Sequence, residues 1–421
     1  MTARGPLPTE APPPWVVVGA GIGGLALAHA WGANASLATH PLMLIEQAPV
    51  LGEVGAGIQL GPNATRLLRQ WGLEPALRDH VCMPHSIQAR NAQGQLVGEL
   101  PLGQTVVARY GAPYWCVHRG DLHRVLQDAL QAHPRQALHL GTTVDSVHTT
   151  GEALGGLSLG LVSGDQPAQT LQAKAVVAAD GVWSAVRRSH WPQSVWQDSG
   201  QVAYRTLIPM DQVPTPWRAP HVQVWMLPLM HVVAYPIQGG RSLNLVVLLE
   251  RQGERLPLDW EQRPQAQWVE DDFAQALKAC PADLRELLGC APDWRVWPLM
   301  ASRPLRGASD MAKGAVALLG DAAHPMLPYM AQGAGMALED AHTLVQLAAE
   351  QARQGALDAP SLFAQYAQAR WARCARVQRK AMRNGHWFHA SGFWAWARDL
   401  GLKSQAQRIM DVPWLYQGVD L

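Results

Sequence analysis

The sequence has few cysteines and almost no net charge. Its five cysteines are widely separated, and none forms a C-x-x-C pair or a His/Cys group with zinc-finger spacing. We therefore expect reduced, packed thiols in a cytosol-like compartment, and no metal site. The formal net charge of +1 gives no global field that would attract nucleic acid or an acidic membrane surface. No nucleic-acid partner is expected.

A segment suited to secretion or to crossing a membrane is also lacking. Residues 1–14 contain five prolines and no apolar core, and they are predicted to form a disordered tail. The next apolar stretch, residues 16–31, is interrupted by glycines and followed by polar residues. Membrane insertion is therefore a poor interpretation, and a cytoplasmic location is expected.

Residues 16–31 instead predict a strand, a tight glycine turn and a helix. Gly19 permits the turn, Gly21 lets the backbone approach a pyrophosphate, and Gly24 lets the helix pack closely on the strand. Free N–H groups at the helix start would bind the anion. Glu46 ends a second strand about 20 residues later, where its carboxylate can accept both hydroxyls of an adenosine ribose. An ADP-ribose moiety of NAD or FAD is expected.

Three later stretches help to distinguish an FAD enzyme from an NAD dehydrogenase. The first is an apolar strand that ends in a Gly-containing turn, at Asp180-Gly181. The second places Arg119 just before Asp121, which is predicted to be the N-cap of a helix. The third is a strand and a proline-rich turn that lead into a glycine-containing helix start, with Gly320, Asp321, Gly333 and Gly335.

In this order, the four motifs resemble the single-component FAD-dependent aromatic hydroxylases, which are group A flavoprotein monooxygenases. The resemblance is strongest to the salicylate, 3-hydroxybenzoate and 6-hydroxynicotinate monooxygenases, and it runs from about Pro14 to about Leu347. It implies an α/β fold with a Rossmann-like FAD-binding domain of the glutathione-reductase type. A β-sheet substrate domain would interrupt that domain, and helices would follow at the C-terminus.

The spacing of the motifs divides the chain in this way. The FAD-binding domain is expected from residues 15–86, 105–200 and 298–360, and the substrate domain from residues 87–104 and 201–297. A hairpin near 91–94 and a turn at 238–241 are predicted within the substrate domain. Residues 361–421 are rich in arginine and tryptophan. They are expected to be helical and to pack on the FAD-binding domain or in a homodimer contact.

The resemblance implies residues that hold FAD. Gly19, Gly21, Gly24, Glu46 and the adjacent Gln47 would bind its ADP half, with Val144 near adenine. Arg119 and Gln59 would lie at the flavin, and Gly320-Asp321 at the ribityl–pyrophosphate region. Asp180 is implied in contacts with both FAD and a transient nicotinamide cofactor. The helix that begins near Gly333 and Gly335 would direct its positive end at the N1/O2 edge of the flavin.

His231 and Tyr235 are the predicted catalytic residues. They lie four apart on one expected strand, so both side chains share a face about 13 Å apart at ~3.3 Å per residue. The resemblance implies His231 as base or proton relay toward a ring hydroxyl and Tyr235 as an orienting group. An imidazole with a pKa of about 6.5 suits that role.

Gln59, Pro328 and Tyr329 are predicted to line the substrate pocket. Gln59 stands where the 6-hydroxynicotinate enzyme has histidine, and Pro328 where the 3-hydroxybenzoate type has glutamine. The Pro328 carbonyl could accept a hydrogen bond from a phenol. His324 and Pro325 are interpreted as turn residues that support this loop. Arg205 and Arg241 are candidates for binding a carboxylate but are left out of the predicted site, because edge and hairpin arginines are commonly solvated.

The expected reaction is hydroxylation of a hydroxylated aromatic carboxylate, with or without loss of the carboxylate, through a C4a-hydroperoxyflavin. FAD is the expected cofactor, with NADH or NADPH and O2 as co-substrates. One alternative is a hydroxylase of a lipophilic quinone precursor or another aromatic secondary metabolite, docked to a membrane by the C-terminal segment. Others are a non-catalytic flavin-binding module and an NAD dehydrogenase without flavin. The sequence leaves open the substrate, the ring position, the carboxylate-binding residue and the oligomeric state.

Overall fold

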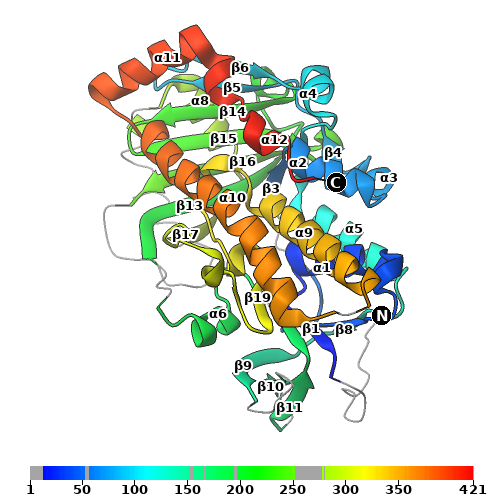
Figure 1. The fold of residues 1–421 in the computed structure, drawn as a ribbon. Coiled ribbons are helices and arrows are strands. Elements are labelled where there is room, and N and C mark those ends of the chain that lie inside the picture. The colour runs from blue at the N-terminus through cyan, green and yellow to red at the C-terminus, as the bar shows by residue number, and fades with distance from the viewer. Residues whose placement is uncertain are drawn as a thin grey trace.

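Helices and strands alternate along the chain, and in the part that the structure describes the strands form two large sheets and two small ones (Figure 1). This architecture confirms the predicted mixed α/β class. The computed structural model describes residues 13–52, 56–150, 156–164, 167–193, 197–251, 277–278, 280–355 and 357–420. The predicted disordered tail lies outside these residues except for its last two positions.

The first large sheet has the strand order β18-β19-β12-β1-β2-β8. β1 pairs in parallel with both β2 and β12, and every residue of these three strands is buried. Full burial is typical of parallel strands that are covered on both faces. The predicted strand–turn–helix is confirmed, because α1 links β1 to β2. The strands are β1 (Trp15–Val18), β2 (Leu42–Ile45), β8 (Ala137–His139), β12 (Ala175–Ala178), β18 (Ala312–Lys313) and β19 (Val316–Leu318).

Helices pack around this sheet in layers. α1 contacts α5 and α9, and the long α10 packs on α9 and crosses the molecule diagonally in Figure 1. This half of the protein contains α1 (Ile22–Gly32), α2 (Pro62–Gln70), α3 (Glu74–Leu77), α5 (Arg119–Leu130), α6 (Ala185–His190), α9 (Gly333–Arg353) and α10 (Ala359–Phe388). Short 3-10 helices lie between them: η1 (Ala35–Leu37), η4 (Ala308–Asp310), η5 (Gly320–Ala322) and η6 (Pro328–Met330).

The second large sheet has the order β17-β13-β16-β15-β14-β5-β6. β15 and β16 form the hairpin predicted around residues 238–241, closed by η3 (Gln238–Gly240), and β5 and β6 form the hairpin expected near residues 91–94. β13 is an interior strand, between β17 and β16. The strands are β5 (Ser86–Arg90), β6 (Leu96–Pro101), β13 (Gln197–Pro209), β14 (His221–Leu227), β15 (Met230–Ile237), β16 (Ser242–Glu250) and β17 (Arg295–Ala301).

Two three-stranded sheets complete the fold. β3 (Gly57–Leu60), β7 (Trp115–His118) and β4 (Val81–Cys82) pair in the order β3-β7-β4, and β7 contacts β15 of the second large sheet. β9 (Thr143–Thr149), β10 (Leu157–Val162) and β11 (Gln169–Ala173) form the other sheet, at the lower end in Figure 1. Two further short elements are α4 (Gly103–Tyr110) and η2 (Thr215–Trp217).

The second large sheet presents two different faces, because strand side chains alternate. One face packs on α8 (Ala282–Gly289) around a separate apolar core, with Val202, Tyr204, Val232, Ala234, Leu245, Val247, Leu284 and Leu287. The other face carries His231, Val233 and Tyr235, and Val233 and Tyr235 pack against the main core. This inner face therefore meets the half of the protein that contains the glycine turn.

The proposed division into FAD-binding and substrate domains corresponds broadly to the two large sheets. Its boundaries at 86/87, 200/201 and 297/298 fall inside β5, β13 and β17. If each of these strands is kept within one domain, each boundary moves by a few residues. The division itself stays a prediction.

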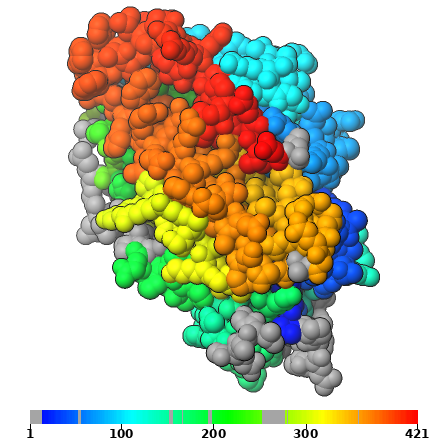
Figure 2. Space-filling view, in the orientation of Figure 1, coloured from blue at the N-terminus to red at the C-terminus, as the bar shows by residue number. Residues whose placement is uncertain are grey.

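The C-terminal helices pack differently from the prediction. α10 packs on α9 as expected, but α11 (Gly392–Met410) lies against β6, at the edge of the second large sheet, and α12 (Pro413–Tyr416) returns to α2. Figure 2 shows these orange-to-red residues across one face of the molecule. Phe393, Trp394 and Trp396 are 60% or more exposed. α11 therefore packs on the second large sheet rather than on the half that contains the glycine turn, and the alternative of a homodimer contact stays a prediction.

The five cysteines are all free thiols, and Cys116, Cys280 and Cys374 are buried. This agrees with the interpretation of reduced, packed residues. Among the described residues, no helix combines the length and apolar character needed to span a membrane.

Candidate active site

The glycine turn between β1 and α1 has the geometry that its sequence predicts. Gly19 has φ +97°, and a Cβ there would lie 2.5 Å from the carbonyl oxygen of Ala179. A Cβ on Gly24 would lie 2.0 Å from the carbonyl oxygen of Gly19, so the helix can approach the turn only with glycine there. Gly21 differs, because a Cβ there would have no atom within 4 Å. No side chain caps the start of α1 at Gly21. The open space beside Gly21 and the free N–H groups of the first helical turn are therefore suited to a pyrophosphate.

Glu46 lies directly beside this turn at the end of β2. Its Oε2 accepts a hydrogen bond from the Ala20 N–H at 2.7 Å, and its Oε1 accepts one from the Ala48 N–H at 2.9 Å. An ionised carboxylate has about four acceptor positions, so each oxygen keeps one for a ribose hydroxyl. Gln47 is exposed, and Val144 is buried near the start of β9. These positions are compatible with the predicted ADP contacts, which stay predictions.

Gly21→Ala and Gly24→Ala are expected to separate cofactor binding from folding. Gly21 has φ −70° and free space around its Cα, so alanine should leave the stability of the apoprotein equal or slightly higher. We expect weaker FAD binding, because the methyl group would occupy the space of the pyrophosphate. Gly24→Ala should lower the melting temperature of the apoprotein in addition to weakening FAD binding, because its Cβ would overlap the Gly19 carbonyl oxygen. Thermal unfolding with and without FAD measures both effects, and equal FAD affinity in Gly21→Ala and wild type would contradict this assignment.

The Asp180-Gly181 turn is tied to the distant Gly320-Asp321 loop. Asp180 Oδ2 accepts a hydrogen bond from the Ala185 N–H at 2.9 Å, while its buried Oδ1 has no hydrogen-bond partner among the described residues. Arg187, in the first turn of α6, donates from Nη1 to the carbonyl oxygen of Ala322 at 2.8 Å. Two predicted cofactor motifs, 140 residues apart, are thus held together, and one carboxylate oxygen is left for a ligand.

Asp321 and Arg119, both predicted to contact the cofactor, influence each other electrostatically. Burial raises the pKa of Asp321, while His324 and Arg119 act in the opposite direction. Burial also lowers the pKa of Arg119 to about 10, and Asp321 opposes that shift. Asp321 is nevertheless solvent-accessible, so its carboxylate is open to a ligand. α9 begins beside it at Gly333, with no side chain capping its first turn.

Asp121 is not the helix N-cap that the sequence suggested. α5 begins at Arg119, His118 occupies the N-cap position, and Asp121 is the third helical residue. Its carboxylate instead accepts a hydrogen bond from Arg124 at 2.5 Å and pairs with His80 at 3.5 Å. The prediction failed because the extended strand β7 ends one residue before Arg119. Arg119 itself is thereby fixed in the first helical turn.

Tyr235 lies where the second large sheet meets β3. A Cβ on Gly57 would lie 2.8 Å from the Tyr235 ring and 2.7 Å from Asn244 Cγ, so glycine permits this approach. The Gly57 N–H donates to Asn244 Oδ1 at 2.7 Å, while the buried Asn244 Nδ2 has no partner among the described residues. Burial raises the pKa of Tyr235, whereas Arg205 and Gln59 act against it. Gln59 also accepts a hydrogen bond from Tyr114 at 2.8 Å.

His231 shares the inner face with Tyr235, as predicted from their spacing. Its ring lies 4.9 Å from that of Tyr329, centroid to centroid, and the Tyr329 hydroxyl donates to Gln201 Oε1 at 2.5 Å. Pro328 begins the same 3-10 turn, and its carbonyl accepts a hydrogen bond from the Ala331 N–H at 3.0 Å. One predicted property is wrong: burial, with His389 adding to it, lowers the pKa of His231 well below 6.5.

Arg205 was excluded on sequence grounds, and the reason for excluding it is wrong. β13 is an interior strand, and the Arg205 guanidinium carbon lies 5.2 Å from the centre of the Trp297 ring. Its buried Nε has no hydrogen-bond partner among the described residues. Its charge acts on both Arg119 and Tyr235. Arg241, in contrast, is exposed, as expected for a hairpin arginine.

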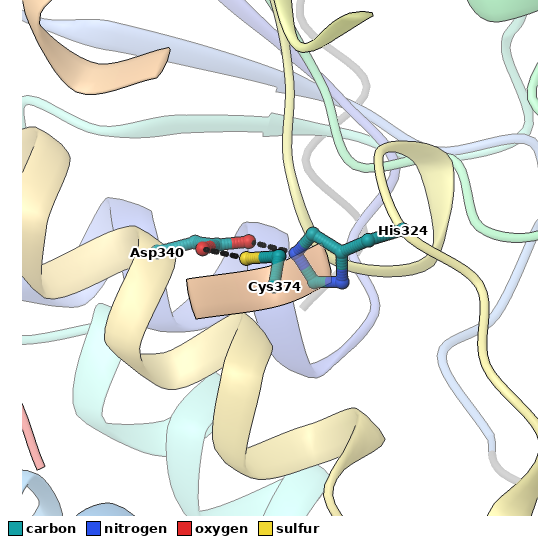
Figure 3. A group of neighbouring side chains, drawn as sticks. All are labelled: His324, Asp340 and Cys374. Carbon is teal, nitrogen blue, oxygen red and sulfur yellow. Dashed lines mark hydrogen bonds and ion pairs between the residues drawn. The ribbon is translucent and has the colours of Figure 1, made fainter. Parts of the chain in front are cut away.

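His324 is more than a turn residue. Its Nε2 lies 2.6 Å from Asp340 Oδ2 on α9, and both side chains are fully buried (Figure 3). With Cys374 they form a group that could hold a metal ion. However, Arg370 Nε already donates to Asp340 Oδ1 at 2.7 Å. A permanent cation beside these ligands disfavours a metal, so we interpret the group as an ion-pair cluster.

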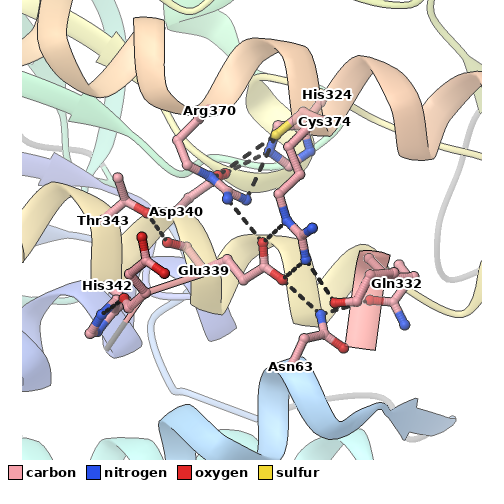
Figure 4. Close-up of polar contacts among 12 residues, drawn as sticks. Asn63, His324, Gln332, Glu339, Asp340, His342, Thr343, Arg370 and Cys374 are labelled. Carbon is pink, nitrogen blue, oxygen red and sulfur yellow. Dashed lines mark hydrogen bonds and ion pairs between the residues drawn. The ribbon is translucent and has the colours of Figure 1, made fainter. Parts of the chain in front are cut away.

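This cluster belongs to a larger buried network that supports the Gly320-Asp321 loop (Figure 4). Asp340 Oδ2 accepts a hydrogen bond from the Gly320 N–H at 3.0 Å, and Arg370 Nη1 pairs with Glu339 at 2.9 Å. Glu339 Oε1 accepts a hydrogen bond from Asn63 Nδ2 at 2.8 Å. Loop, α2, α9 and α10 are therefore joined through charges without contact to solvent.

Comparisons with known proteins agree with this geometry. Residues 14–381 match the family described as FAD binding domain. The chain is 32% identical to the 3-hydroxybenzoate 6-hydroxylase of Polaromonas naphthalenivorans (strain CJ2), over 96% of this chain and 95% of that protein. It is 33% identical to the 3-amino-4-hydroxybenzoate 2-monooxygenase PtmB3 of Streptomyces platensis, over 95% and 94%. A solved salicylate hydroxylase substrate complex has the same fold, with TM-score 0.74, 23% identity, and 97% and 98% coverage.

Proposed function

The chain belongs to the FAD binding domain family and is an FAD-dependent aromatic monooxygenase, and we propose that it uses NAD(P)H and O2 to hydroxylate a hydroxylated aromatic carboxylate. The family match argues against the alternative of an NAD dehydrogenase without flavin. Two similar proteins named for hydroxybenzoate substrates support the proposed substrate class.

One observation supports this substrate class most directly. The inner face of the second sheet carries a cation, Arg205, and a neutral imidazole, His231, on strands separated only by β16. Ala203 and His231 share a row of the sheet, because both pair with Leu248, and Arg205 lies two residues further along β13, on the same face as Ala203. This pattern offers a partner for a carboxylate and, two strands away on the same face, a partner for a ring hydroxyl.

The proposed chemistry divides among the residues of this face. Arg205 would bind the carboxylate and, by its charge, favour the phenolate form of the ring. His231 would accept the phenol proton, and Tyr235 with Gln59 would orient the ring. Tyr329 and Phe388 would exclude water from one side. When bound, FAD supplies the activation of oxygen and accepts the electrons of NAD(P)H.

Arg205→Gln is expected to raise KM for a hydroxybenzoate by roughly 10- to 100-fold, the equivalent of about 1.5–3 kcal/mol for a charged hydrogen bond. For a phenol without a carboxylate, KM should rise much less, because this substrate makes no contact with the guanidinium. Arg241→Gln, on the exposed hairpin, is the matched control. Equal KM changes for the acid and the plain phenol would contradict this role.

A substrate screen tests the proposed function itself. Salicylate, 3- and 4-hydroxybenzoate, gentisate and 6-hydroxynicotinate would be compared for stimulated NADH and NADPH oxidation, with products identified by mass. A product heavier by one oxygen indicates hydroxylation, and one that has also lost carbon dioxide indicates a decarboxylative reaction. A yellow protein that consumes no NAD(P)H with any acid would favour the non-catalytic flavin-binding module.

The exposed aromatic residues of α11 favour a second substrate class, a lipophilic ring held at a membrane surface. The exposed rings of Phe393, Trp394 and Trp396 contact one another, and Arg383 on α10 and Lys403 on α11 are also exposed. Salt-sensitive sedimentation with anionic lipid vesicles would support this alternative. Concentration-dependent dimerisation that disappears in Trp394→Ser would assign these rings to a homodimer contact instead.

A further inference from the structure

A chain of three titratable side chains leads from His231 to the surface. His231 Nδ1 lies 2.8 Å from His389 Nε2, at the end of α10. His389 Nδ1 lies 2.9 Å from Glu250 Oε1, at the end of β16. His231 and His389 are only 1% and 6% exposed, whereas the Glu250 side chain is 38% exposed. The chain thus begins on the inner face of the sheet and ends in solvent.

The order of partners decides which nitrogen of each imidazole carries hydrogen. An ionised Glu250 can only accept, so His389 must carry its proton on Nδ1. Neutral His389 then accepts at Nε2, and His231 must donate from Nδ1. The lone pair of His231 is therefore on Nε2, which has no hydrogen-bond partner in the part of the chain that the structure describes. The arrangement makes this nitrogen the basic one.

We propose that His389 and Glu250 relay the proton taken up by His231 to solvent. A substrate O–H would transfer its proton to His231 Nε2, the Nδ1 proton of His231 would pass to His389 Nε2, and the Nδ1 proton of His389 would pass to Glu250 Oε1. Glu250 then releases a proton to water, so one proton leaves the substrate and one enters solvent. Protonation of the product reverses the sequence and restores both imidazoles. This inference rests on the proposed function, because it requires a substrate hydroxyl beside His231.

The low basicity of His231 explains why a relay would be needed. Burial lowers the pKa of His231 well below 6.5, so its protonated form is strongly disfavoured. A base of this kind takes a phenol proton effectively only if it passes the charge on. Burial also lowers the pKa of His389, although its hydrogen bond to Glu250 opposes that shift. Neither imidazole is thus charged at rest.

Other groups near the relay do not replace its members. From η6, the Tyr329 ring faces both imidazoles, with its centroid 5.8 Å from that of His389, but its hydroxyl donates to Gln201. On α10, exposed His386 lowers the pKa of His389. From α11, Arg398 donates to the carbonyl oxygens of Trp387 and Phe388 and pairs with Asp399.

Proton release on substrate binding tests the relay. FAD-loaded enzyme would be mixed with 3-hydroxybenzoate in weakly buffered solution with a pH indicator, while the ultraviolet spectrum reports phenolate formation. His389→Ala and Glu250→Gln should slow proton release by on the order of 100-fold, the scale of a lost proton-transfer group. Added imidazole should restore much of the rate in His389→Ala. His386→Gln, the exposed control, should release protons at the wild-type rate with or without imidazole.

Two results separate this proposal from the proposed function. Wild-type rates of proton release in both His389→Ala and Glu250→Gln, with phenolate still formed, would overturn the relay. Glu250→Gln is at the surface, so it keeps the test valid if His389→Ala folds poorly. Absence of phenolate in the wild-type enzyme with every acid of the screen would count against the proposed function instead.

Discussion

His231→Ala is expected to lower kcat for hydroxylation by roughly 100- to 10,000-fold, the range for loss of a positioned acid–base group. FAD affinity should be unchanged, because His231 lies among Tyr329, Phe388 and His389 rather than beside the glycine turn or the Gly320-Asp321 loop. The measurements are product formation by mass spectrometry and FAD binding by fluorescence. Loss of both to the same degree would reduce His231 to a structural residue.

His231→Ala should also be distinguishable from the relay variants. Without His231 the bound phenol has no immediate acceptor, so phenolate should fail to form at neutral pH. In His389→Ala the proton acceptor, His231, is still present, and only the onward transfer of a proton from His231 is slow. Raising the pH toward the pKa of the free phenol should therefore recover part of the activity of His231→Ala. Tyr235→Phe, on the same face, is the comparison variant, and it should retain most proton transfer because the imidazole is intact.

The nucleotide-binding half of the fold could be predicted because its signals are local. Residues 16–46 contain a strand, a glycine turn, a helix and a second strand within one crossover, and each element is set by neighbours in sequence. The pairing of β13 with β17 joins positions about 95 residues apart, such as Ala203 and Trp297, and no local pattern records it. This is why β13 was mistaken for an edge and Arg205 was excluded.

The polar partners within the site were less predictable. His231 and Tyr235 share a strand, so their common face follows from the period of two. His389 and Glu250 approach each other across 139 residues, at the ends of a helix and a strand whose lengths the sequence does not define so exactly. One signal was available for Arg205: a single charge inside the apolar run "VAYRTLIP" indicates a charge that the fold must accommodate.

Arg370→Met is expected to destabilise the protein by about 3–5 kcal/mol, the usual cost of leaving a buried charge without its partner. Arg370 is 1% exposed and pairs with both Glu339 and Asp340, which are fully buried. Methionine fills a similar volume but leaves the carboxylates of Glu339 and Asp340 with less compensating positive charge. Urea unfolding of the apoprotein measures the effect. Arg379→Met, on the exposed side of the same helix, should change the free energy of unfolding by less than about 0.5 kcal/mol.

The pH dependence of unfolding gives this network a second signature. Burial alone would raise the pKa of Asp340, but His324 and Arg370 lower it to about 2. Its contribution should therefore be complete above the ordinary value of 3.8 and be lost as the pH falls through about 2. For His324, burial alone would lower the pKa, but Cys374 and Asp340 raise it well above 6.5.

The His324 contribution should thus be complete below pH 6.5 and be lost as the pH rises through its raised pKa. Together the two groups predict a plateau of stability between roughly pH 4 and 6.5, with losses on both sides. Asp340→Asn removes the anionic partner of His324 and Arg370. It should therefore reduce the loss of stability at both low and high pH, and weaken the attachment of Gly320 to α9. An Asp340→Asn protein with the wild-type pH profile would show that these charges are not coupled to folding, and the stability of the Gly320-Asp321 loop would then have to come from packing alone.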